Sequence, residues 1–198
     1  MNNEDIARKI IELKNSDLEL RNRLLKKGQL AKRYNKEMEK LHNRNAAELQ
    51  HIIDDIGYPT IDKVGEEASD AAWLIIQHAI SQPEFMRNCA ESLKKAVDED
   101  KADPKHLAYL VDRIAVFEGK PQLYGTQFDW DEHGEMSPNS FDDLAKVNHR
   151  RKSIGLNTLE EQIDIMRARV RNENQAPPTD IEERRMQYNH WRRTVGWI

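Results

Sequence analysis

The feature that most constrains the fold is a stripe of apolar residues near the start of the chain. From Ile6 onward these residues fall at alternating spacings of four and three, which places them on one face of an α-helix. We call this stripe the N-terminal seam; it consists of Ile6, Ile10, Leu13, Leu20, Leu24, Ala31, Tyr34, Met38 and Leu41. Because Asp17, Lys27 and Gly28 interrupt the seam, we expect either one long kinked helix or two helices in series.

An apolar seam of this length has to be covered, since contiguous exposed apolar surface is unusual in a soluble monomer. Two arrangements fit the sequence equally well. The helices can form a hairpin that covers the seam within the chain, or the seam can contact a protein partner, including a second copy of the chain in a coiled coil. Gly57, followed by Pro59, marks the end of this N-terminal arm, because glycine and a following proline commonly end helices.

Helical periodicity continues through the rest of the chain. It predicts helices over 65–81, 83–100, 104–118, 141–153, 159–172 and 180–194. Thr158 with Glu161 and Thr179 with Glu182 have the spacing of a capping box at the start of the last two. No segment is convincing as a β-strand. The sequence therefore predicts a mainly α fold: a helical arm over 1–56, a compact helical core domain over 57–171, and a linker with a C-terminal helix over 172–198.

Composition excludes several classes of protein. No apolar run approaches the roughly 18 residues of a membrane span, and the first residues lack the order of a signal peptide, so we expect a cytoplasmic protein without a membrane partner. The single cysteine, Cys89, cannot form an internal disulfide. Basic residues predominate over 1–50 and 149–198 and acidic residues over 51–148. Nucleic acid is not an expected partner, because no recognised binding motif accompanies the basic ends.

The first candidate for chemistry is His78. It shares a helix face with Ala71, Leu74 and Ile75, so the sequence points it inward, with Gln77 beside it. A lone histidine on an apolar face is more often a hydrogen-bonded core residue than a catalytic group. On pattern alone, both interpretations stay open.

Asp112 and Arg113 form the second candidate. They interrupt a helix that is apolar on nearly every side between Leu107 and Phe117, and such a helix tends to be buried. A buried charge without a partner costs several kcal/mol, so each of the two needs a partner elsewhere. His78 is a candidate partner for Asp112. A buried ion-pair network that only fixes the position of the helix explains the same pattern.

A loop rich in hydrogen-bonding side chains follows this helix. Glycine and proline break the segment from Gly119 to Phe128, which carries Gln122, Tyr124 and Gln127. Loops held by a rigid scaffold often present binding groups. Turn formation alone would also explain the glycines.

These candidates lie within longer strings that resemble a known family. The strings 57–60, 64–79, 110–113 and 121–128 are similar to the signature of a bacterial family called domain of unknown function 6624. The resemblance extends roughly from Asp17 to Met166, and Asp17–Arg21 resembles that family's upstream acidic-to-arginine element. It implies that the Gln-His, Asp-Arg and Tyr-Gly-Thr-Gln elements belong together. It implies no activity.

Familiar metal and nucleotide motifs are missing from the sequence. There is no His-Glu-x-x-His, no Cys/His pair spacing and no phosphate-binding glycine loop, so we predict no metal ligands, and the cofactor stays unknown. The segment 129–134 resembles the first half of a calcium loop. Ser140 stands where the bidentate glutamate of such a loop belongs, so we interpret the segment as a solvated acidic loop.

Two hypotheses for function follow. In the first, the protein is an enzyme or binder of an unknown small molecule, with His78 and Asp112 as catalytic residues. Its ligand-binding residues are then Gln77, Arg113, Gln122, Tyr124 and Gln127. In the second, it is a helical interaction or structural module whose N-terminal seam and tryptophan-bearing tail contact partners. Clustering of diverse polar groups around an apolar helix slightly favours the first.

Overall fold

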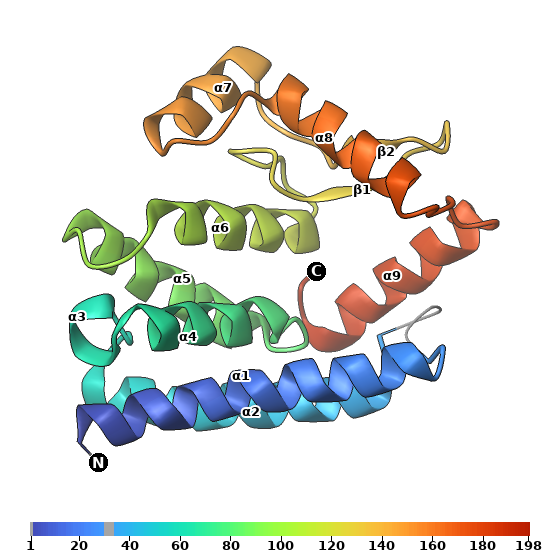
Figure 1. Ribbon diagram of the computed structural model, residues 1–198. Coiled ribbons are helices and arrows are strands. Elements are labelled where there is room, and N and C mark those ends of the chain that lie inside the picture. Colours follow the sequence, from blue (N-terminus) through green and yellow to red (C-terminus); the bar gives the residue numbers. More distant parts are fainter. Residues whose placement is uncertain (1, 30–33) are drawn as a thin grey trace. The chain divides into compact units, whose positions relative to one another are not determined.

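The computed structural model describes residues 2–29 and 34–198 and shows a mainly α-helical protein, as the sequence predicts (Figure 1). The seam residue Ala31 lies outside the described residues. The chain divides into two compact units, unit 1 over Met1–Asp103 and unit 2 over Pro104–Ile198. The predicted division at 56/57 and 171/172 stays a prediction. Within the described residues, no helix combines the length and the apolar character needed to cross a membrane.

Unit 1 is built around a helical hairpin. Its helices are α1 (Asn3–Lys26), α2 (Lys36–Ile56), α3 (Ile61–Val64), α4 (Glu66–His78) and α5 (Pro83–Asp98). Lys9 of α1 pairs with Glu48 of α2, whereas Arg23 pairs with Glu37, so the two helices run antiparallel. Helix α4 packs against both (Figure 1).

The hairpin and α4 cover much of the N-terminal seam within unit 1. The seam residues that are buried are Ile6, Ile10, Leu13, Leu24 and Met38. The predicted interruption at Gly28 is confirmed, because α1 ends at Lys26 and Gly28 has a φ of +65°, a left-handed conformation that favours glycine. Asp17 does not interrupt the helix: it lies inside α1 and is buried.

Unit 2 contains four of the predicted helices and a small sheet. Its elements are α6 (Pro104–Glu118), β1 (Phe128–Trp130), β2 (Met136–Pro138), α7 (Leu144–Ser153), α8 (Leu159–Asn172) and α9 (Ile181–Val195). The capping box of Thr158 and Glu161 is confirmed, whereas α9 is capped by Asp180 and not by Thr179.

The prediction of no strands was wrong. β1 and β2 pair antiparallel, and Phe128 is opposite Pro138 in their register. Each strand has three residues, too few to show the alternation of apolar and polar residues by which a strand is recognised in a sequence. The acidic segment 129–134 contributes to β1 and to the turn that follows it.

Candidate functional site

The most unusual polar residue of unit 1 is Asp17. It follows Leu13 by four positions and precedes Leu20 by three, so it occupies a position of the apolar seam. Helix α1 therefore turns its carboxylate into the core, where the side chain is only 1% exposed. An ionised carboxylate in such a place needs partners, because burial without them costs several kcal/mol.

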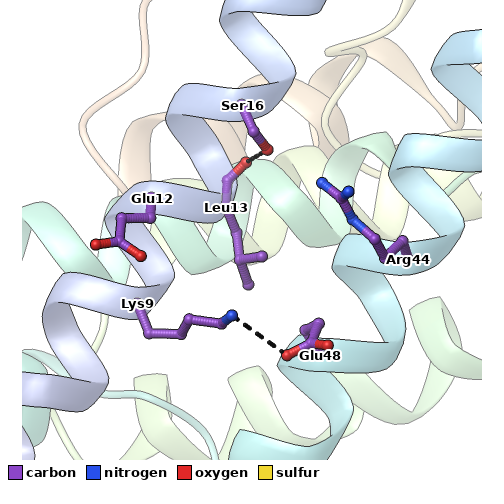
Figure 2. A pocket seen from close by; sticks show the side chains of 6 residues that line it. All are labelled: Lys9, Glu12, Leu13, Ser16, Arg44 and Glu48. Atoms are coloured by element: carbon purple, nitrogen blue, oxygen red, sulfur yellow. Dashed lines mark hydrogen bonds and ion pairs between the residues drawn. The ribbon is translucent and has the colours of Figure 1, made fainter.

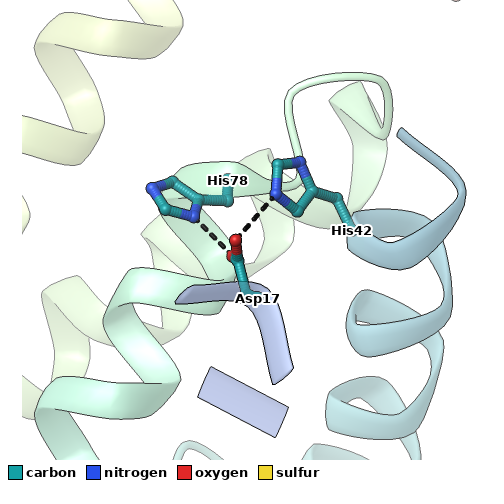
Figure 3. Close-up of side chains that lie close together, drawn as sticks. All are labelled: Asp17, His42 and His78. Carbon is teal, nitrogen blue, oxygen red and sulfur yellow. Dashed lines mark hydrogen bonds and ion pairs between the residues drawn. The ribbon is translucent and has the colours of Figure 1, made fainter. Parts of the chain in front are cut away.

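Two histidines from two other helices supply those partners. Nδ1 of His78, at the end of α4, lies 2.6 Å from Oδ2 of Asp17, and Nε2 of His42 on α2 lies 3.2 Å from Oδ1 (Figure 3). The ring centroids of the histidines are 5.2 Å apart. We call Asp17, His42 and His78 the His-Asp-His cluster. It joins α1, α2 and α4 at one point.

The two contacts determine the charge of the carboxylate. Burial by itself raises the pKa of Asp17, but hydrogen bonds from His42 and His78, together with their charge, hold that pKa well below its usual range. Asp17 is therefore a carboxylate at neutral pH, with both oxygens directed at imidazole nitrogens.

Tyr34 extends the cluster on the side of His42. Its hydroxyl lies 2.7 Å from Nδ1 of His42, and it also hydrogen-bonds Ser81. Burial raises the pKa of Tyr34, so the hydroxyl stays protonated and can both donate and accept. The contact engages Nδ1 of His42 and directs Nε2 towards Asp17.

The cluster has a buried side and a more open side. The side chain of His42 is 8% exposed, whereas that of His78 is 26% exposed. The second ring nitrogen of His78, Nε2, lies on the far side of the ring from Asp17 (Figure 3). An arrangement of two imidazoles and a carboxylate can orient His78 for contact with a ligand, or it can hold a metal ion.

The sequence model of a family described as "Family of unknown function (DUF6624)" matches residues 4–170. The chain belongs to this family. The matched range contains the whole His-Asp-His cluster and the loop after α6, while α9 begins beyond it. No curated protein and no solved structure matches the chain.

Among the predicted site residues of this DUF6624 chain, Asp112 has a clear structural role in unit 2. It is fully buried, and its carboxylate accepts hydrogen bonds from the backbone N–H groups of Leu123, Tyr124 and Thr126 and from the Thr126 hydroxyl, at 2.8–3.2 Å. Burial raises its pKa, and these bonds oppose the shift. Asp112 thus fixes the loop after α6. Within unit 1 the carboxylate that contacts His78 is Asp17. The suggested pairing of Asp112 with His78 stays a prediction.

Gln122 and Gln127 form further hydrogen bonds that fix this loop. The Gln122 side chain is buried, donates to the carbonyls of Gln127 and Asn139, and accepts from the Gln127 N–H. Nε of Arg113 donates to Oε1 of Gln127 at 3.2 Å, and burial lowers the pKa of Arg113. The structure therefore brings Asp112, Arg113, Gln122, Tyr124 and Gln127 together around one loop. Their assignment to catalysis or ligand binding stays a prediction.

The remaining predicted residue, Gln77, is buried on α4 next to His78. Sequence reasoning missed Asp17 and His42 as site residues. Asp17 occupies a position of the seam, and His42 lies on the buried apolar face of α2, four residues after Met38 and seven before Leu49. A polar residue at the apolar position of an amphipathic helix was the available signal, because such a residue needs a buried partner.

Unit 1 also has an open groove between α1 and α2 (Figure 2). It is lined by Lys9, Glu12, Leu13, Ser16, Arg44 and Glu48. The Lys9–Glu48 ion pair crosses it at 3.5 Å (Figure 2). Its two basic and two acidic side chains give it no net preference for ligand charge.

Proposed function

We propose that this DUF6624 protein is a small-molecule-binding protein or enzyme whose site is centred on His78, with Asp17 and His42 behind it. The observation that carries the proposal is the Asp17 carboxylate, 1% exposed, in contact with imidazoles from two other helices, one of which is 26% exposed. His78 is then the residue that contacts the ligand. Asp17 orients its ring, the role that the sequence suggested for Asp112.

Stability alone does not call for such a cluster. Buried ionic networks are commonly no more stable than well-packed apolar residues of similar size, and often less. Leucine or isoleucine at position 17 would continue the seam on α1, and at position 42 it would continue the buried apolar face of Met38 and Leu49 on α2. The presence of three polar side chains at this point therefore favours a functional role over a purely structural one.

The position of His78 supports the same role. It is the last residue of α4, where the negative end of the helix dipole favours a side chain that donates a hydrogen bond. Its Nδ1 is held by Asp17, which leaves Nε2 on the far side of the ring for a polar group of a ligand. Polar small molecules are commonly fixed by a few such oriented groups in an otherwise apolar site.

A thermal-shift screen against a panel of polar metabolites tests the proposal. We expect at least one compound to raise the melting temperature of the wild type and of His51→Gln, a control at an exposed histidine of α2, but not of His78→Gln. No stabilising compound for the wild type would overturn the proposal. Equal stabilisation of His78→Gln would also overturn it, because the ligand would then bind elsewhere.

The alternative function is a helical interaction module that uses the N-terminal seam and the tryptophan-bearing tail. Such a module needs those side chains at its surface. Ile6, Ile10 and Leu13 of the seam are buried within unit 1, and Trp197 of the tail is buried against Phe117 within unit 2. The small-molecule role is therefore the better supported of the two.

A further inference from the structure

The atoms that the His-Asp-His cluster presents are of the kinds that bind metal ions in proteins. One ligand atom from each of Asp17, His42 and His78 lies within 4.8 Å of the others. Three helices of unit 1 carry them to this point: α1, α2 and α4. Residues so far apart in the chain give no short spacing motif, which is why the sequence indicated no metal.

The donor set selects the class of metal. Two imidazole nitrogens and one carboxylate oxygen suit Zn²⁺, Fe²⁺ and related divalent transition metals, whereas Ca²⁺ and Mg²⁺ prefer sites made of oxygens alone. Three protein ligands leave coordination positions open for water or for a ligand, which is typical of catalytic and not of structural zinc sites. Two histidines and a carboxylate are also the ligands of many non-haem Fe²⁺ sites.

Tyr34 is placed to support His42 as a ligand. A histidine that binds a metal through one ring nitrogen usually donates a hydrogen bond from the other, which fixes the tautomer and the orientation of the ring. The Tyr34 hydroxyl lies 2.7 Å from Nδ1 of His42 and can accept this bond while it donates elsewhere, because it also contacts Ser81. Nε2 of His42, which faces Asp17, is then free to coordinate.

Charge and burial favour a cation at this point. The Asp17 carboxylate is removed from water and ionised, and a divalent ion would offset its negative charge at a shorter distance than an imidazole N–H does. We propose that Asp17, through a carboxylate oxygen, His42, through Nε2, and His78, through Nδ1, bind a single divalent transition-metal ion of the Zn²⁺ or Fe²⁺ class. The inference deepens the proposed function and rests on it, since the ion would lie beside His78, the residue proposed to contact the small molecule.

Direct metal binding tests the inference without any organic ligand. The full chain, without a polyhistidine tag, is stripped with a chelator, and its affinity for Zn²⁺ and, anaerobically, Fe²⁺ is measured by calorimetry. The visible spectrum of the Co²⁺ form reports the nitrogen and oxygen ligands. We expect one ion per chain in the wild type and in His51→Gln. Tyr34→Phe should lower the affinity about 10- to 100-fold, as loss of a supporting hydrogen bond does.

Replacement of a ligand should lower the affinity further than Tyr34→Phe does. Asp17→Asn can also unfold unit 1, so His78→Gln, at the more exposed end of the cluster, is the decisive variant, with circular dichroism as the check on its fold. No ion on the wild type, or wild-type affinity in a folded His78→Gln, would overturn the inference. Metabolite binding by a wild type that binds no ion would overturn the inference and leave the proposed function standing. If the protein binds the ion but no metabolite, the metal site stands and the proposed small-molecule function is overturned.

Discussion

Nδ1 of His78 lies 2.6 Å from Oδ2 of Asp17, although the two residues are 61 positions apart in the chain. The contact joins the last residue of α4 to the middle of α1, while the other oxygen of Asp17 contacts His42 on α2. One buried carboxylate thus connects three helices of unit 1. The consequences for stability can be measured separately from any function.

Asp17→Asn should destabilise unit 1. The amide replaces one carboxylate oxygen by an NH₂ group, so one of the two histidines loses its acceptor, and a buried polar group without a partner is costly. We expect the free energy of unfolding, measured by urea titration in a chelator, to fall by about 2–4 kcal/mol. Glu19→Gln, at an exposed position of the same helix, should change it by less than about 0.5 kcal/mol. Equal values for both variants would contradict a buried network.

Asp112→Asn should destabilise unit 2 for a related reason. Both oxygens of Asp112 accept hydrogen bonds from the loop, from three backbone N–H groups and the Thr126 hydroxyl. An amide NH₂ would face these donors, so we expect a loss of about 2–4 kcal/mol in the free energy of unfolding. Faster amide hydrogen exchange at Leu123 and Thr126 should accompany it. Asp164→Asn, at an exposed position of α8, is the control, and a matching loss there would remove the special role of Asp112.

Much of the fold could be predicted from the sequence, because helical periodicity and end signals are local. The helices predicted over 104–118 and 159–172 begin and end where α6 and α8 do. The sequence also indicated that Asp112 needs a buried partner. It could not identify that partner as backbone N–H groups, since every residue except proline carries one.

The candidate site was only partly predictable. His78 was found because it lies on an apolar helix face, and the family resemblance drew attention to it. Asp17 was interpreted as an interruption of the seam, and His42 was not singled out. Their proximity depends on how α1, α2 and α4 pack, and no spacing along the chain encodes that packing. The polar residue at a seam position was the one local sign of it.

Gly125→Ala should be more harmful than an alanine at another glycine of similar conformation. Gly125 has a φ of +64°, and an added Cβ would lie 2.8 Å from Cδ1 of Leu159, a fully buried side chain. Gly28 has a φ of +65°, with nothing within 4 Å of such a Cβ. We expect Gly28→Ala to cost about 1 kcal/mol of unfolding free energy for its backbone conformation. Gly125→Ala should cost about 1–3 kcal/mol more, because a buried side chain has to move. Equal losses of unfolding free energy in the two variants would show that the Leu159 side chain can move away at little cost.

Trp197→Ala should loosen the C-terminal helix from unit 2. The Trp197 ring is 4% exposed and stacks on Phe117, at the end of α6, with ring centroids 4.9 Å apart. Arg192 of α9 also donates to the carbonyls of Val116 and Phe117, and the rings of Tyr188 and Trp191 contact Phe117, so several contacts besides that of Trp197 attach α9 to the end of α6. Loss of a buried tryptophan ring costs about 3 kcal/mol or more.

Limited proteolysis should therefore cleave the exposed segment 171–177 faster in Trp197→Ala than in the wild type. Ile198→Ala, at a neighbouring side chain that is 49% exposed, is the matched control and should be cleaved at the wild-type rate. If Trp197→Ala were cleaved no faster than Ile198→Ala, the Trp197 ring would not be what holds α9 in place.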